Sequence, residues 1–103
     1  MQTQKISGGL AVTAVWEARD GEAETVADIL GRFAPQAQQE PGVKLFLVHR
    51  SVENSAQFLF YELFDDMAAF EAHQQTPHFK SLIVGEGVPR LKRRERTQYQ
   101  VLA

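Results

Sequence analysis

The sequence contains no cysteine. This absence excludes disulfides, thiolate metal sites and cysteine nucleophiles, and it gives no sign of an oxidising compartment. No stretch approaches the roughly 20 consecutive apolar residues that a membrane span needs. The segment Met1–Gly9 is polar, carries only Lys5 as a charged side chain and lacks the apolar centre of a signal peptide. We therefore expect a cytoplasmic protein without a membrane partner.

A strong net charge is also lacking, because 11 basic residues stand against 13 acidic ones for a formal charge of -2. A dedicated nucleic-acid binder needs a broad basic surface, so we expect no nucleic-acid partner. Apolar residues make up 44% and charged residues 23% of the 103 residues, which is typical of a globular domain. We expect one domain over residues 8–103 and a flexible N-terminus over residues 1–7.

Hydrophobic periodicity predicts the first half of the chain as strand, helix, strand, strand. Residues 10–17 alternate as in a strand, and apolar residues from Ala23 to Ala37 recur at spacings of three and four, as on one face of a helix. Pro41 and Gly42 end the helical region. Residues 43–51 and 57–64 are then predicted to be strands joined by a short polar connection.

The second half is predicted to hold a helix and a last strand. Asp65 or Asp66 is suited to cap the helix, and Thr76 followed by Pro77 restarts it. We expect the glycines and proline of residues 85–89 to break the helix and residues 97–102 to form the final strand. The order of elements predicts an α+β, ferredoxin-like βαββαβ fold with both helices on one face of the sheet.

Both faces of the predicted sheet are apolar. The strand over residues 57–64 places three phenylalanines on one side and Leu59, Tyr61 and Leu63 on the other. Helices cover only one face in this topology, and monomers usually tolerate no more than a few hundred Å² of contiguous apolar surface. We therefore expect a homodimer, with a second copy on the open face. The alternative is a monomer whose outward apolar residues are scattered.

Four short segments resemble a known family. They are Gln39–Val43 (QEPGV), Phe60–Asp66 (FYELFDD), Ala69–His73 (AFEAH) and Thr76–Phe79 (TPHF). In this order they are similar to the antibiotic biosynthesis monooxygenase (ABM) family. The resemblance implies a dimeric α+β barrel. It also implies one of several activities: cofactor-free oxidation of phenols or quinols, haem degradation, or isomerisation of a phosphorylated signalling sugar.

The family's branches place different demands on the site. The haem-degrading branch implies a tryptophan where this chain has His73 and an iron-ligating histidine where it has Ile83. The phenol-oxidising branch implies a tryptophan at Phe64 and an asparagine at Phe60. The chain therefore departs from the haem branch, and relative to the phenol branch it keeps aromatic character while losing two polar groups.

His73 and Glu62 are the candidate catalytic residues. A cofactor-free oxygenase needs a base that converts its substrate to an electron-rich anion, and an imidazole titrates near neutrality. The alternative for His73 is a structural bridge between helix and sheet. Glu62 lies on an apolar strand, so it either faces the mouth of a pocket or is buried with a partner such as His73 or an arginine.

Aromatic side chains and His49 are the candidate substrate-binding residues, although most aromatics at such spacings fill a core. Trp16 belongs to the same aromatic set. The candidates are Phe46, Phe60, Tyr61, Phe64, Phe70, Phe79 and His49. The three histidines show no helical i, i+4 pairing, so we expect no metal site. The resemblance to cofactor-free oxygenases implies that no cofactor is needed.

Residues 90–96 hold five of the eleven basic residues. This run could attract an anionic or phosphorylated substrate or a nucleic acid, or it could be a solvated approach to the final strand that discourages edge pairing. The absence of interleaved aromatic residues favours the solvated approach over base stacking. Three functions remain open. The first is a cofactor-independent monooxygenase acting on a small quinol or phenol with O2. The others are an isomerase of a small phosphorylated or carbonyl metabolite and a dimeric ligand-binding protein without turnover.

Overall fold

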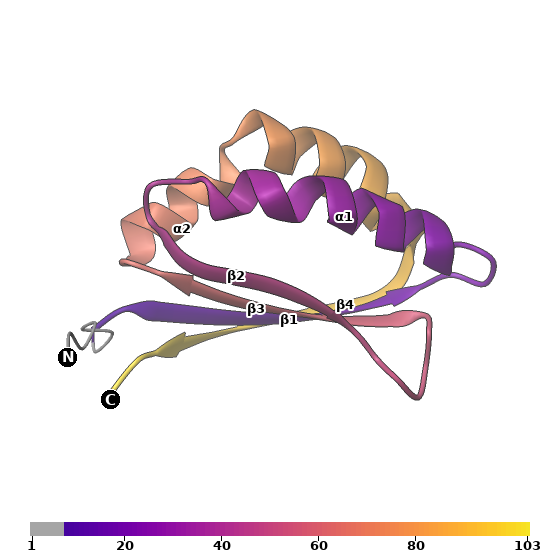
Figure 1. Ribbon diagram of the computed structural model, residues 1–103, viewed down its shortest axis with the longest axis horizontal. Helices are drawn as coiled ribbons and strands as arrows, with labels where there is room; N and C mark the ends of the chain where they lie inside the picture. Colours follow the sequence, from indigo (N-terminus) through magenta and orange to yellow (C-terminus); the bar gives the residue numbers. More distant parts are fainter. Residues whose placement is uncertain (1–7) are drawn as a thin grey trace.

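A computed structural model describes residues 8–103 as one antiparallel sheet with all helices on one face (Figure 1). The predicted flexible segment, residues 1–7, lies outside the described residues. The strands are β1 (Leu10–Ala18), β2 (Val43–Arg50), β3 (Gln57–Phe64) and β4 (Leu91–Gln100), in the spatial order β2-β3-β1-β4. The helices are α1 (Ala23–Gln38) and α2 (Met67–Gln74), followed by a wide π-type helix (Phe79–Gly87) and a 3-10 turn (Val88–Arg90). The predicted ferredoxin-like fold is confirmed.

The core lies between the helices and the inner face of the sheet. The side chains of Trp16, Phe46 and Phe60 rise from three strands, and Phe33 of α1 packs against Phe46 with 5.6 Å between ring centroids. All four are buried. The alternation that predicted the strands therefore places their aromatic side chains against the helical layer, as a sheet covered on one face requires.

The outer face of the sheet is apolar but uncovered. Leu45, Leu47, Leu59 and Tyr61 remain 36–42% exposed, and Tyr99 on β4 is 52% exposed. Their neighbours along β2 and β3 point inward and are buried or half-buried, because successive side chains of a strand alternate between faces. The predicted two-sided apolar character is thus present in the described residues.

The predicted capping residues of the second helical region, Asp66 and Thr76, make the expected contacts. The side chain of Asp66 accepts a hydrogen bond from the amide of Ala69 at 2.9 Å, so Asp66 caps α2. The hydroxyl of Thr76 accepts from the amide of Phe79 at 3.2 Å and donates to the carbonyl of His73 at 2.8 Å. Thr76 therefore ties the end of α2 to the start of the π-type helix.

The last helix ends within the predicted residues 85–89, at the second of the two glycines rather than the first. The π-type helix continues through Gly85 and ends at Gly87. A Cβ atom at Gly87 would lie 2.8 Å from the ring of Trp16. Glycine is used here because the helix backbone approaches the tryptophan closely, which a local sequence pattern does not reveal.

The predicted bounds of the last strand, residues 97–102, are wrong. β4 begins at Leu91, six residues before the predicted start, and ends at Gln100 rather than Leu102. The basic run is therefore the strand itself rather than an approach to it. All β4 residues after Leu91 are exposed, so the strand carries no apolar alternation to detect. Its pairing with β1 defines it instead.

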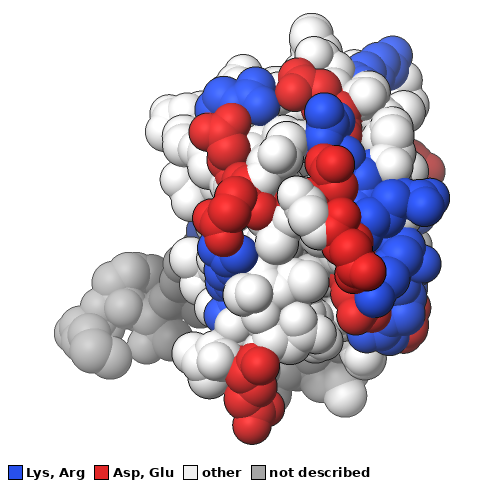
Figure 2. Space-filling model, turned by 90° about the vertical axis from the view of Figure 1, so that its right-hand side faces the viewer, with Lys and Arg blue, Asp and Glu red and all other residues white. Residues whose placement is uncertain are grey.

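Ion pairs join β2 to the start of α1 and β4 to the end of β1. Arg50 contacts Glu24 at 2.6 Å, and Arg93 contacts Glu17 at 3.4 Å. Figure 2 shows acidic and basic side chains side by side at this end of the molecule. Exposed pairs of this kind contribute about 0–1 kcal/mol each, so the fold rests mainly on the apolar core.

We predict that Gly42→Ala destabilises the protein because Gly42 lies against α2. A Cβ atom at Gly42 would be 2.4 Å from the Cβ of Ala69. Overpacking of this kind costs about 1–3 kcal/mol, measurable as a lower free energy of unfolding in denaturant. Gly31→Ala is the matched control, since nothing lies within 4 Å of its added Cβ. We expect it to stabilise α1 by about 0.5–1 kcal/mol.

The double variant Gly42→Ala/Ala69→Gly tests the cause. Removing the Cβ of Ala69 relieves the contact, so the double variant should lose less stability than the sum of the two single losses. Additive losses would contradict the proposed clash.

Candidate functional site

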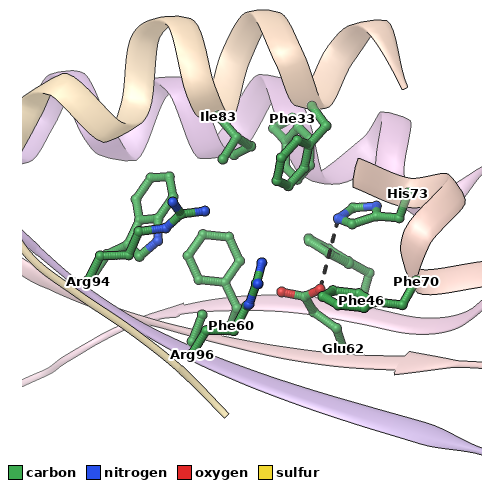
Figure 3. A pocket seen from close by; sticks show the side chains of 12 residues that line it. Phe33, Phe46, Phe60, Glu62, Phe70, His73, Ile83, Arg94 and Arg96 are labelled. Atoms are coloured by element: carbon green, nitrogen blue, oxygen red, sulfur yellow. Dashed lines mark ion pairs between the residues drawn. The ribbon is translucent and has the colours of Figure 1, made fainter. Parts of the chain in front are cut away.

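A small pocket lies between the inner face of the sheet and the helices (Figure 3). Its cavity volume is about 30 Å³, enough for a water-sized molecule. Aromatic rings form most of its wall, with two arginines, a glutamate and a histidine as its charged or titratable groups. The lining residues are Ala14, Trp16, Phe33, Phe46, Phe60, Glu62, Phe70, His73, Phe79, Ile83, Arg94 and Arg96.

His73 projects from α2 into this pocket and is 2% exposed. Its Nδ1 lies 2.9 Å and 3.0 Å from the two carboxylate oxygens of Glu40. Burial lowers the pKa of His73, although Glu40 acts in the opposite direction, so the imidazole is neutral at neutral pH. A carboxylate only accepts hydrogen bonds, so the single proton is on Nδ1 and the lone pair is on Nε2.

Glu40 fixes this arrangement from the turn between α1 and β2. It also accepts a hydrogen bond from Nε2 of His78 at 2.7 Å. The sequence marked Glu40 only as part of the Glu-Pro-Gly segment, and its role beside His73 was missed. The contact joins residues 33 positions apart, so no local spacing could have indicated it.

Glu62 faces the pocket from β3 and is 6% exposed. Its Oε1 lies 3.9 Å from Nε2 of His73, the contact marked in Figure 3. Burial raises the pKa of Glu62 to about 8; Arg96 and Arg94 oppose this shift and Glu40 adds to it. Glu62 is therefore mainly protonated at neutral pH, and its neutral carboxyl can donate a hydrogen bond. The expected partner of Glu62 is therefore His73 at 3.9 Å, a contact longer than a hydrogen bond.

Arg94 and Arg96 enter the pocket from β4. Both extend from the strand toward the helical layer (Figure 3), and the guanidinium carbon of Arg96 lies 5.1 Å from the centre of the Phe70 ring. Burial is the largest influence lowering the pKa of Arg94, followed by the charge of Arg96. Sequence reasoning noted the basic run but not its alternation, which sends every second side chain inward.

The structure brings together most of the predicted site residues. His73, Glu62, Phe46, Phe60, Phe70 and Phe79 line the pocket. Phe64 is fully buried and packs on His73 with 5.3 Å between ring centroids, but it does not line the pocket. Phe33 is an additional wall residue, missed because its helical spacing indicated ordinary core.

The structure places Tyr61 and His49 outside the pocket. This corrects the prediction that they belong to the same site as the other candidates. Tyr61 stands between Phe60 and Glu62 on β3, both of which point inward, and therefore faces outward. His49 pairs with Leu59 across the outer face, and its Nδ1 lies 3.1 Å from the Leu59 carbonyl oxygen. Strand alternation places both residues on the side of the sheet away from His73.

Two classes of feature are missing from the described part of the chain. Over residues 8–103, no helix combines the length and apolar character required to span a bilayer. In the same residues, histidine and carboxylate side chains form no group of three or more that could hold a metal ion.

Solved structures share the fold over nearly the whole chain. PA3566 from Pseudomonas aeruginosa is 29% identical, with a TM-score of 0.85 over 97% of this chain and 100% of that one. SO0527 from Shewanella oneidensis is 22% identical, with a TM-score of 0.85 over 96% and 98% of the two chains. The crystal structure of an antibiotic biosynthesis monooxygenase is 19% identical, with a TM-score of 0.85 over 91% and 99%.

Family models give a more specific result than these structural likenesses. No curated protein matches the chain. The family model described as antibiotic biosynthesis monooxygenase matches residues 9–83, from the start of β1 into the π-type helix. This range contains Glu40, Glu62 and His73. The chain therefore belongs to the antibiotic biosynthesis monooxygenase family.

Proposed function

We propose that this protein is a cofactor-independent monooxygenase that oxidises a small quinol or phenol with O2. The observation that carries the proposal is the state of His73. Its Nε2 is unprotonated, lies inside an aromatic pocket and is oriented by the hydrogen bond from Nδ1 to Glu40. A base in this position can remove a proton from a substrate hydroxyl. Family membership supports the same reaction class.

The reaction needs no electron donor other than the substrate. A quinol deprotonated by His73 is an electron-rich anion, which passes an electron to O2 and then forms a carbon–oxygen bond. For hydroquinone, the products are 2-hydroxy-1,4-benzoquinone and one water molecule, so one oxygen atom enters the ring and the other leaves as water. The ring loses four electrons and O2 gains four.

Glu62 is suited to the opposite proton transfer. Its carboxyl group is mainly protonated at neutral pH and lies 3.9 Å from Nε2 of His73. It can donate a proton to the peroxide oxygen that leaves as water when the oxygen–oxygen bond breaks. The pocket thus places a neutral base and a neutral acid side by side, as acid and base steps on one substrate require.

We also propose that two copies associate through the outer face of the sheet. That face carries Leu45, Leu47, Leu59, Tyr61 and Tyr99 as exposed large side chains. Typical interfaces bury about 800 Å² on each partner, a scale that one face of a four-stranded sheet can supply. A twofold pairing of identical faces covers both copies with a single contact.

We predict that His73→Gln abolishes most of the oxygenase activity, because an amide cannot act as the base. Positioned general bases contribute about 100- to 10,000-fold, so hydroxyquinone formation and O2 uptake with hydroquinones should fall at least about 100-fold. Glu71→Gln, an exposed substitution on the same helix, is the matched control and should keep the wild-type rate. Equal rates for His73→Gln and wild type would remove His73 from the reaction.

We predict that Glu62→Gln changes the pH dependence of stability. The pKa of Glu62 rises from 4.5 to about 8 on folding, so its stabilising contribution is complete below pH 4.5 and is lost as pH rises through about 8. One pKa unit corresponds to about 1.4 kcal/mol. Wild type should therefore lose a few kcal/mol of unfolding free energy relative to Glu62→Gln across this range. Unfolding curves that stay parallel would contradict a protonated Glu62.

We predict that Leu59→Arg separates the proposed dimer, because it places a charge at the centre of the apolar outer face. Light scattering should give twice the 11.6 kDa chain mass for wild type and the single-chain mass for the variant. Val84→Arg, at a 53% exposed position on the helical side, is the control and should remain dimeric. A wild-type particle of one chain mass would end the dimer proposal.

A further inference from the structure

The basic run of β4 has two chemically different faces. Arg93 points outward, where it contacts Glu17 at 3.4 Å and also pairs with Glu95. Arg94 and Arg96 point inward and line the pocket. Because side chains alternate between the two faces of the strand, Arg93 forms ion pairs on the outer face, whereas Arg94 and Arg96 face the pocket.

Within residues 8–103, no carboxylate forms an ion pair with either of the inward arginines. Among the described residues, the ion pairs of the basic run involve its other members, and neither Arg94 nor Arg96 takes part in one. Glu62 is the only acidic residue in the pocket wall, and it is mainly protonated at neutral pH because burial raises its pKa to about 8. Within residues 8–103, the pocket wall thus presents two positive charges and, at neutral pH, only a small negative charge on Glu62 to offset them.

The pairing of the strands places Arg94 away from His73 and Glu62, the proposed reacting groups. Glu62 pairs with Val12 on β1, whereas Arg94 pairs with Trp16 on the other side of the same strand. Four residues of strand span about 14 Å. Arg96, opposite Ala14, lies halfway between these levels. His73 and Glu62 therefore occupy one end of the site and Arg94 the other, with aromatic rings between them.

The arginines are also the part of the wall best able to move. A cavity of about 30 Å³ cannot hold an aromatic ring, so substrate entry requires some lining side chains to shift. The phenyl rings and Trp16 are packed in the core, whereas Arg94 and Arg96 are exposed residues on an edge strand. A substrate entering past β4 meets the two guanidinium groups first.

We propose that Arg94, assisted by Arg96, binds a carboxylate on the substrate, so that the pocket selects hydroxylated aromatic acids over neutral quinols. The inference rests on the proposed function for the identity of the reacting end, where the hydroxyl meets His73. A carboxylate at the other end removes the repulsion between the two like charges. Guanidinium groups match carboxylates with paired, charge-assisted hydrogen bonds.

The test measures binding of two matched probes without oxygen. The probes are 2,5-dihydroxybenzoate and 2,5-dihydroxybenzamide, which share the quinol ring and differ in the charge of one substituent. Isothermal titration calorimetry under argon excludes turnover. We expect the acid to bind at least about tenfold more tightly than the amide, as a charge-assisted hydrogen-bonded pair predicts. The preference should shrink as salt concentration rises.

Two variants locate the effect. Arg94→Gln should reduce the preference for the acid to within about twofold, because its guanidinium is the proposed partner. Arg93→Gln makes the same change of charge on the adjacent, outward position and should keep the preference. Equal loss in both variants would indicate general attraction to a basic strand and would overturn the proposal. Equal affinity of wild type for acid and amide at low salt would overturn it without any variant.

The same probes separate this proposal from the oxygenase proposal. Tight, Arg94-dependent binding of the acid with no O2 uptake in air would uphold the anion site and remove the monooxygenase function. O2 uptake that is equally efficient with hydroquinone and with 2,5-dihydroxybenzoate would uphold the oxygenase and remove the selectivity.

Discussion

The hydrogen bond between Glu40 and His73 is the interaction on which the chemistry of the site depends. An imidazole presents its lone pair on either nitrogen, and only a partner on the other nitrogen fixes which one. Glu40 is that partner, and it reaches His73 because Gly42 allows the turn after α1 to pack closely on α2. A requirement of backbone packing thus determines which nitrogen faces the pocket.

Burial sets the charge of two titratable groups in the pocket, His73 and Glu62. Removing His73 and Glu62 from water disfavours their charged forms, so the pKa of the imidazole falls and that of the carboxyl rises. The two shifts leave both groups neutral near neutral pH. The arginines keep their charge because a guanidinium loses its proton only at very high pH. The result is a polar but neutral reacting end and a cationic end within one small space.

The sheet separates two functions by the alternation of its side chains. Inward positions of β2, β3 and β1 provide the aromatic wall and Glu62, while outward positions provide an apolar surface of leucine and tyrosine. A single strand contributes to both, since Tyr61 and Glu62 are neighbours in sequence and face opposite sides. The four-stranded sheet is therefore at once the floor of the candidate site and the face that we propose meets a second copy.

The sequence by itself determined the order of elements, the inward aromatics and the outward apolar face, because these follow from local periodicity of two or 3.6 residues. It also singled out His73, because an imidazole titrates near neutrality and this one matches the family's helix histidine, and Glu62, because it is a carboxylate on an apolar strand. Only the tertiary structure brought Glu40 to His73 and Arg94 to the pocket, because both depend on contacts between residues distant in the chain. For the same reason it alone separated Tyr61 and His49 from the site. It alone also placed the start of β4 at Leu91, because the exposed residues of the basic run become a strand by pairing with β1.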